Sequence, residues 1–274
     1  LSGIDVKNLR VKYEDTDTGH MFRGNLEELV SGFNRLDPGK AVYDLKDTRI
    51  NGLYVSGKLG ASTEDTTSSG PLPEVRLKGL NAQNINWDLD LGQQYTSGSR
   101  ADLALDLRDL NLPAMQLDIA RLASSFEQVT FKDKKAAPAT VAGEINFSDL
   151  ALNDLKLSAE DLLVKDSIMA GKVSQFSFLE KSGLELRKLN VQASLKGNTL
   201  LLEEVEMATA ASELKATVKA DLDTANYARS RFDAVIAGLK LAPSDAFFFE
   251  KSLAQTLAPV RNDVITGRGR IRGT

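Results

Sequence analysis

The sequence contains no cysteine, so disulfide bonds and thiolate metal sites are excluded. It has one histidine, His20, and metal sites built from histidine and cysteine are therefore excluded by count. Aromatic residues make up only 6% of the chain, and leucine supplies much of the apolar content. No run of about 18 apolar residues is present, which is the length that a membrane-spanning helix requires.

The charge balance excludes a further class of function. The net charge of -4 comes from both signs mixed along the chain, which argues against general nucleic-acid binding because that function needs a basic face. The 274 residues suffice for one large all-β domain or two smaller ones. Residue 1 is leucine, there is no signal peptide, and strand-like sequence reaches almost to both ends. We therefore expect a fragment or processed product, with any membrane anchor outside it.

Alternation of apolar and polar residues is the main positive signal, and it is most sustained over residues 183–222. A two-residue period is typical of a β-strand with one apolar and one polar face. Between Leu186 and Leu189 the period slips by one residue. Such a slip turns every later side chain to the other face unless an inserted residue absorbs it.

The slip recurs in an octad, h-x-h-x-x-h-x-h, where h is an apolar residue. Its uneven spacing is not that of a fixed-period solenoid. The octad predicts a bulged strand that is used repeatedly and is apolar on one side, and bulges curve a sheet into a trough or barrel. Ordinary strands of a β-sandwich fit the period equally well. Copies begin at Ile4, Val75, Leu105, Leu150, Leu184 and Leu200.

Turn signals divide the chain. Asp15 to Gly19 resembles the start of a calcium loop but lacks its third ligand and its sixth-position glycine, so we expect a turn. Asp37-Pro38-Gly39 predicts another turn, with strands near 41–49 and 52–59 after it. Residues 60–73 are polar and predict a flexible loop within one continuous sheet over residues 1–274.

Two later segments have competing interpretations. Residues 115–126 fit a helix face or a strand, and we favour the strand because LDIARL matches half an octad. Residues 139–222 predict nearly unbroken strands. The best helix is 244–257, capped by Ser244 and ended by Pro259, with Phe249, Leu253 and Leu257 on one face. It either packs on the sheet, which we favour, or touches a membrane.

The sequence contains no catalytic constellation, and we expect no enzyme activity, cofactor or metal. His20 is expected in a solvated loop, with no nucleophile elbow in the chain. Glu203, Glu204 and Glu206 fit the polar face of a strand. Arg268, Arg270 and Arg272 fall on one strand face, which either meets phosphate groups or is simply exposed.

Function is therefore expected in the apolar face itself. The residues predicted to line a hydrophobic groove share the alternating pattern: they are Ile85, Trp87, Leu89, Leu91, Leu103, Leu105, Leu107, Val141, Ile145, Phe147, Leu189, Val191, Leu195, Leu214, Val218 and Leu222.

Three motifs carry a resemblance to a known family. The first is F-x-E-x-S-G-h, at Phe178, Glu180, Ser182, Gly183 and Leu184; then come an L-x-x-L strand reaching Leu189 and T-x-x-S-x-L at Thr209, Ser212 and Leu214. The C-terminal LKLAPSDAFFFEKSL and ITGRGRIRGT look like a strand–helix–strand segment of the same family. In these motifs the chain resembles the AsmA-like/TamB (translocation and assembly module) proteins of double-membraned bacteria.

The resemblance implies a mainly β fold: an elongated, curved, taco- or U-shaped antiparallel β-sheet with a hydrophobic groove and one short helix near the C-terminus. It implies a periplasmic segment, anchored in the inner membrane by a helix outside this chain, that moves phospholipid between the inner and outer membranes. An outer-membrane barrel protein of the TamA type is the implied protein partner.

Two other functions stay open at this point. One is a scaffold for outer-membrane barrel assembly or secretion, which would use exposed strand edges. The other is a closed β-sandwich with a structural or adhesive role and a fully buried core.

Overall fold

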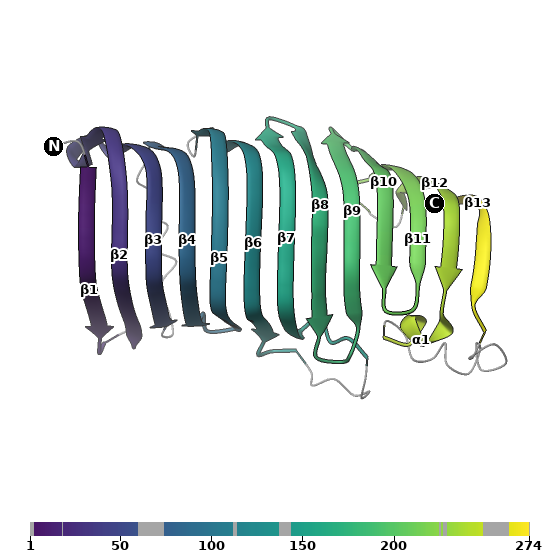
Figure 1. Ribbon diagram of the computed structural model, residues 1–274, viewed down its shortest axis with the longest axis horizontal. Helices are drawn as coiled ribbons and strands as arrows, with labels where there is room; N and C mark the ends of the chain where they lie inside the picture. The colour runs from purple at the N-terminus through teal and green to yellow at the C-terminus, as the bar shows by residue number, and fades with distance from the viewer. Residues whose placement is uncertain are drawn as a thin grey trace. The chain divides into compact units, whose positions relative to one another are not determined.

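The computed structural model of this protein describes residues 3–17, 19–59, 74–111, 114–136, 144–224, 226, 229–248 and 263–273. Thirteen strands dominate this part of the chain, which confirms the predicted mainly β class (Figure 1). The strands are β1 Gly3–Asp15, β2 His20–Asp37, β3 Val42–Lys58, β4 Glu74–Asp90, β5 Gln94–Asn111, β6 Gln116–Asp133, β7 Asp149–Lys165, β8 Ile168–Glu180, β9 Glu185–Lys196, β10 Thr199–Thr209, β11 Glu213–Asp221, β12 Arg231–Leu241 and β13 Ile265–Gly273. Two short helices accompany them, the 3-10 turn η1 Pro38–Lys40 and the α-helix α1 Pro243–Ala246.

The strands belong to one open, curved sheet in which they follow one another in sequence order from β1 to β13. The sheet is mainly antiparallel, but β3 and β4 run parallel, with Val42 beside Glu74 and Lys58 beside Asp90. The antiparallel sheet that the family resemblance implied is thus confirmed, with β3 and β4 as a parallel pair within it. Parallel neighbours require a long connection, and fifteen residues, 59–73, separate these two strands.

The chain forms two compact units, each described here by itself. Unit 1 comprises Leu1–Ala137 with Phe147–Leu155, and unit 2 comprises Pro138–Asn146 with Lys156–Thr274. Unit 1 holds β1 to β6 and the start of β7, and unit 2 holds the rest of β7 and β8 to β13. The flexible loop that we expected over 60–73 lies outside the described residues.

Left-handed residues inside strands absorb the slip of the octad. Asn8, Asp154 and Glu204 have φ of 54°, 51° and 51°, and each stands at the fifth position of its octad. The register also shifts between Leu202 and Val205 in the pairing of β10 with β11. The predicted bulge is confirmed at Glu204, where an extra residue resets the alternation and returns later apolar side chains to the original face. At Asn8 the register is unbroken, with Lys7 beside Glu28 and Leu9 beside Leu26, so the left-handed residue absorbs the slip without a bulge.

Four further octads lie within the strands and were not recognised in the sequence. Gly52, Asn84, Arg100 and Asp161 also have positive φ inside strands. Each is the fifth residue of an octad that begins at Thr48, Leu80, Thr96 or Leu157. These copies were not recognised because threonine, glycine or alanine occupies at least one of the positions where the octad pattern requires a large apolar residue. Glycine, asparagine and aspartate tolerate the left-handed conformation better than other residues, which explains most of this set.

Several expectations about single segments are confirmed. Residues 116–133 form β6 and no helix, and residues 38–40 form the turn that Asp-Pro-Gly predicted. The residues from Asp15 to Gly19 that the structure describes make a turn in which the Gly19 N–H donates to the Asp15 carbonyl at 2.9 Å. The strands expected near 41–49 and 52–59 are one strand, because the left-handed glycine Gly52 lets β3 continue without a break in register.

Other expectations were wrong. His20 is the first residue of β2 and lies beside Asp15, where the hairpin register places it in the sheet instead of the loop. The helix begins with Pro243 at its first turn and has Ala242 at its N-cap, so Ser244 is not the cap. It ends at Ala246, and Phe249, Leu253, Leu257 and Pro259 lie outside the described residues. No helix in the described ranges is long and apolar enough to cross a membrane.

Candidate apolar sheet faces

Unit 1 has an apolar face built from rows of side chains that run across its strands. In antiparallel and parallel pairs alike, residues directly opposite each other point to the same face of the sheet. The central row passes through every strand from β1 to β5, and rows on either side of it are also apolar. These rows are Leu9–Leu26–Leu53–Ile85–Ala101, Val11–Gly24–Val55–Trp87–Gly98–Val129 and Val6–Leu29–Ile50–Ala82–Leu103.

The predicted groove residues of β4 and β5 all fall in these rows or next to them. Ile85 and Trp87 stand in the rows just given, and Leu89 extends the next row, where it lies beside Gly57 and Thr96. Leu103 lies beside Ala82, and Leu105 lies between Leu80 and Leu122. Leu107 lies beside Ile119 and is buried, whereas Leu91 follows the end of β4 and is 41% exposed.

Trp87 is the chain's single tryptophan and sits in the middle of this face. Its ring covers Gly98 so closely that a Cβ at Gly98 would lie 2.1 Å from it. Beyond Gly98 the indole meets the edge of Phe126, with ring centroids 6.0 Å apart. The indole N–H donates to Thr96 Oγ1 at 3.2 Å, so the polar atom is satisfied while the ring faces apolar neighbours.

Unit 2 has an equivalent apolar face. Leu189 shares a row with Met207, Leu214 and Leu239, and Val191 lies beside Val173. Leu195 and Val218 stand in two longer rows, each of which crosses six strands from β8 to β13. These rows are Met169–Leu195–Leu200–Ala220–Phe232–Gly273 and Gly171–Ala193–Leu202–Val218–Ala234–Ile271.

Besides Leu91, four predicted groove residues do not belong to the apolar rows. Val141 lies outside the described residues. Ile145 and Phe147 precede β7 in a segment that is not a strand, so the strand pattern was wrong there, and Phe147 is 65% exposed. Leu222 follows the end of β11, where its N–H donates to the carbonyl of Asn198 at 2.8 Å.

The apolar faces are only partly covered. Among the described residues eight apolar side chains are buried, and half of them are alanines: Ala82, Ala101, Leu107, Ile119, Ala159, Leu184, Leu186 and Ala216. Leu9, Val11 and Tyr13 on β1 are 45%, 44% and 55% exposed. Most predicted groove residues are half-buried. A single sheet shields one side of its apolar residues and leaves the other accessible to a ligand.

Strands β1 to β3 contribute to the apolar face, and this contribution was not predicted from the sequence. Leu26 and Leu29 on β2 and Leu53 on β3 stand at the centre of the rows. The octad at Ile4 and the overlapping copy that begins at Thr48 carried this signal. Threonine in the first position hid the second copy, and Thr48 itself bonds Ser31, with the two hydroxyl oxygens 2.7 Å apart in the buried part of the same face.

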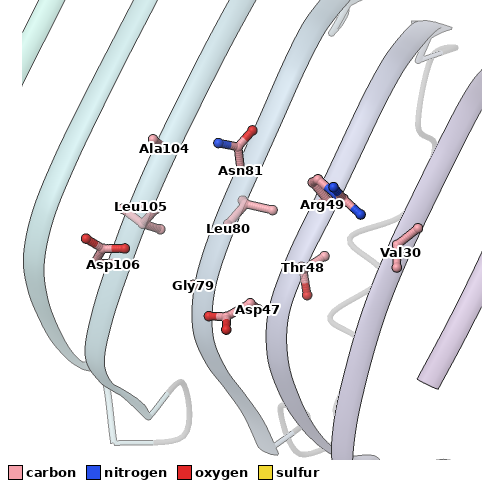
Figure 2. Close-up of a pocket in the computed structure, with 10 residues that line it drawn as sticks. All are labelled: Val30, Asp47, Thr48, Arg49, Gly79, Leu80, Asn81, Ala104, Leu105 and Asp106. Carbon is pink, nitrogen blue, oxygen red and sulfur yellow. The ribbon is translucent and has the colours of Figure 1, made fainter. Parts of the chain in front are cut away.

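The opposite face of unit 1 is polar and holds a shallow depression of about 350 Å³ (Figure 2). It lies around Gly79 and Ala104, where small residues leave a gap between β2, β3, β4 and β5. Asp47, Arg49 and Asp106 add charges of both signs to its lining. Asp47 and Asp106 also form ion pairs with exposed Lys78 and Arg121. Nothing in this mixture singles out one ligand.

The polar face of unit 2 carries cross-strand ion pairs. Glu206 on β10 lies between Lys188 on β9 and Lys215 on β11, at 2.6 Å and 2.9 Å from their ammonium groups. The hydrogen bond from Lys188, and next that from Lys215, lower the pKa of Glu206 to about 2. Glu206 is therefore charged at neutral pH and pairs with both lysines across the strands. Glu203 is exposed beside Gln192, which places it on the polar face as expected.

The arginines of β13 are also on the polar face. Asp233 on β12 accepts hydrogen bonds from both Arg270 and Arg272. The bond from Arg270 is the main cause of the lowered pKa of Asp233. Two of the three arginines that we considered for phosphate binding are thus held by a carboxylate.

The residues of the family-like motifs meet at one end of unit 2. Glu180 is 1% exposed in the turn between β8 and β9, where its Oε2 accepts the Ser182 N–H at 2.6 Å. Among the described residues, neither its Oε1 nor the Ser182 hydroxyl has a hydrogen-bond partner. Gly183, with φ of 103°, faces the ring of Phe248, which follows α1. The turn between β8 and β9 therefore packs against the α1 segment and supports it.

The turn between β10 and β11 also forms hydrogen bonds to the α1 segment. Thr209 donates to the carboxylate of Asp245 in α1 and accepts the Ser212 N–H at 2.8 Å. Ser212 Oγ in turn accepts the Ala242 N–H at 3.0 Å. Figure 1 shows α1 at the ends of β10 and β11, next to these turns. The motif residues thus hold the α1 segment in place and form no catalytic arrangement.

The described residues contain no group of three or more histidine, cysteine, aspartate or glutamate side chains that could hold a metal ion. No protein-family model matches the chain. No curated protein and no solved structure matches it either. The apolar faces are accordingly the candidate functional site of the chain.

Proposed function

We propose that this chain is a periplasmic segment of an AsmA-like/TamB-type protein, and that its apolar sheet faces shield the acyl chains of phospholipids moving between two membranes. The observation that carries the proposal is the continuity of the apolar rows across successive strands in each unit. The motifs at Phe178–Leu184 and Thr209–Leu214 support the family assignment.

The energetics of such a face favour lipid chains. Each methylene group removed from water contributes about 0.8 kcal/mol, so a chain lying along several rows would gain affinity with every strand that it crosses. The half-buried side chains remain accessible to such a ligand. The opposite face is charged, with exposed ion pairs such as Arg100–Glu127 and Lys7–Glu28, and suits contact with water.

Lipid analysis of the purified protein tests the proposal. Native mass spectrometry and lipid extraction should find phospholipid bound to the wild-type chain. The double variant Leu103→Gln/Leu105→Gln should lose it, because both residues stand in the apolar rows of unit 1. Ala104→Gln is the matched control, since Ala104 points to the polar face beside Asn81. A lipid-free wild-type chain contradicts the proposal.

A second candidate is a scaffold for outer-membrane barrel assembly with a partner of the TamA type. It is favoured by the make-up of β1, which is 13 residues long and contains no proline that would block pairing of its backbone with a further strand. A photo-crosslinking residue at Lys12 should then capture a barrel protein in place of lipid. The closed β-sandwich is not retained, because the strands belong to one sheet instead of two facing sheets.

A further inference from the structure

The slips of neighbouring strands in unit 1 lie side by side. The ladder of residue pairs between β1 and β2 passes over Asn8 and Glu27, although the register on either side of them is kept. The ladder between β2 and β3 passes over Glu27 and Gly52, and the ladder between β3 and β4 passes over Gly52 and Asn84. Three of these four residues, Asn8, Gly52 and Asn84, have left-handed φ. The interruptions therefore fall at one level of four successive strands.

The same level continues through β5 and β6. Two residues of β4, Asn84 and the one before it, face Asp102 alone, and two residues of β5, Arg100 and the one before it, face Asn86 alone. The ladder between β5 and β6 then passes over Arg100 and Glu127. The slip line of unit 1 thus crosses six strands, and its residues are Asn8, Glu27, Gly52, Asn84, Arg100 and Glu127.

Side chains bridge the slip line where the ladder is interrupted. The Asp102 carboxylate accepts the Asn84 N–H at 3.0 Å, and the side-chain oxygen of Asn86 accepts the Arg100 N–H at 3.0 Å. The guanidinium of Arg100 also forms an ion pair with Glu127 at 2.8 Å. Exposed side chains thus provide contacts that paired strands provide on either side of the line, so the sheet is held less firmly along it.

Unit 2 has a slip line of its own. Between β9 and β10, Glu204 and the residue after it face Val191 alone, and between β10 and β11, Glu204 and the residue before it face Thr217 alone. Ala237 is the extra residue in the pairing of β11 with β12. A depression of about 460 Å³ follows this line, and these four residues are part of its lining. The sheet is therefore hollowed along the slip line of unit 2.

Aligned slips concentrate bending at one level of a sheet. A bulged or left-handed residue bends its strand, and bends at the same level of neighbouring strands add up to a fold along the line. We propose that the slip lines are hinges: the parts of the sheet on the two sides of a line swing about it, and the curvature of the apolar face adjusts to the acyl chains that it takes up. The adjustment rests on the proposed lipid function, whereas the hinge itself does not.

Distances between spin labels test the adjustment, and the absence of cysteine leaves the wild-type chain without competing label sites. Ala123→Cys/Lys132→Cys on β6 spans the slip line of unit 1, because Glu127 lies between the two positions. Asp5→Cys/Ala123→Cys is the control pair, since these residues stand in one row on one side of the line. In double electron–electron resonance, phosphatidylcholine vesicles should shift the first distance by about 1–2 Å, as expected for a change in bend of about 20–30° over this length of strand, and leave the second unchanged.

Variants that remove the bridging side chains test the hinge without lipid. Asp102→Ala/Asn86→Ala leaves two backbone N–H groups of the slip line without their acceptors, so the distribution of the distance across the line should become about 1.5-fold broader. Asp102→Asn keeps an acceptor oxygen and should retain the wild-type width. Asp106→Ala is the matched control, because Asp106 is exposed on the same face of β5 but pairs with Arg121 away from the line.

An unchanged width in Asp102→Ala/Asn86→Ala, or an equal broadening in Asp106→Ala, would overturn the hinge. A distance across the line that stays fixed while the protein takes up vesicle lipid would overturn the adjustment of the apolar face. If the protein takes up no lipid, the proposed function fails, and the widths measured without lipid still decide whether the slip line is a hinge.

Discussion

The indole of Trp87 on β4 crosses over Gly98 on β5 and reaches Phe126 on β6, so one side chain joins three neighbouring strands of the apolar face. The contact depends on the absence of a side chain at Gly98. The same contact places the only fluorescent indole of the protein among the residues to which lipid chains are proposed to bind.

Replacement of Gly98 by alanine should destabilise the protein. The new Cβ would lie 2.1 Å from the ring of Trp87, so the indole must leave its position or the strands must separate. We expect a loss of about 1–3 kcal/mol of unfolding free energy, measured by urea denaturation followed through tryptophan fluorescence. Gly238→Ala has open space around it and serves as the control, with little change expected. Equal effects of the two variants would show that Trp87 does not rest on Gly98.

The left-handed residue Glu204 gives a prediction of opposite sign. Its φ of 51° is unfavourable for a residue with a side chain, and glycine adopts this conformation without strain. Glu204→Gly should therefore raise the free energy of unfolding by about 1 kcal/mol. Glu203→Gly, the control in the preceding residue, should lower it by about 0.5–1 kcal/mol because ordinary strand positions disfavour glycine. If both variants destabilise equally, the bulge is not at Glu204.

The ion pairs of Glu206 predict a dependence of stability on pH. Lys188 and Lys215 lower the pKa of this carboxyl from 4.5 to about 2 in the folded protein. The folded state thus binds a proton less readily than the unfolded state, so this contribution is fully present above pH 4.5 and is lost as the pH falls towards 2.

Thermal unfolding of Glu206→Gln and the wild type across this pH range measures the contribution. The wild type should be the more stable protein above pH 4.5, and the difference should vanish near pH 2. Because the three side chains are exposed, added salt should reduce the difference at neutral pH. A difference that is constant from pH 2 to 7 would mean that Glu206 is not ion-paired.

The contact between Thr209 and Asp245 predicts which part of unit 2 loosens first. Thr209→Val keeps the shape of the side chain but removes the hydrogen bonds to Asp245 and to the Ser212 N–H. We expect a loss of about 1–3 kcal/mol, with faster hydrogen exchange at the α1 segment and the turn between β10 and β11. Thr217→Val on the exposed polar face of β11 should leave exchange there unchanged. Unaltered exchange in Thr209→Val would show that these bonds do not hold α1.

Periodicity predicted the strands and their bulges well because it records which side chains must share a face. The octad located the left-handed residues Asn8, Asp154 and Glu204, but its copies at Val75, Leu105 and Leu184 have no left-handed residue at the same position. The parallel pairing of β3 with β4 could not be predicted, since each strand has the same alternation whichever way its neighbour runs. A pattern of apolar residues also does not show where a strand begins, which is why Ile145 and Phe147 were placed in one.

The buried support for α1 was beyond the reach of pattern analysis. Glu180 and Asp245 are charged residues, yet they are 1% and 7% exposed. Their burial arises from contacts between three turns that are far apart in the sequence. The family-like motifs marked these residues as important, but only the fold explains their role.

Quenching of Trp87 by phospholipid tests the central claim most directly. Vesicles of phosphatidylcholine brominated on the acyl chain would be mixed with the protein, with unbrominated vesicles as the control and Leu103→Gln/Leu105→Gln as the variant expected to respond weakly. If acyl chains lie on the apolar face, the brominated lipid should quench the indole strongly while the unbrominated lipid does not. Tryptophan fluorescence that is the same with both lipids, under conditions where the protein has taken up lipid, would contradict the account.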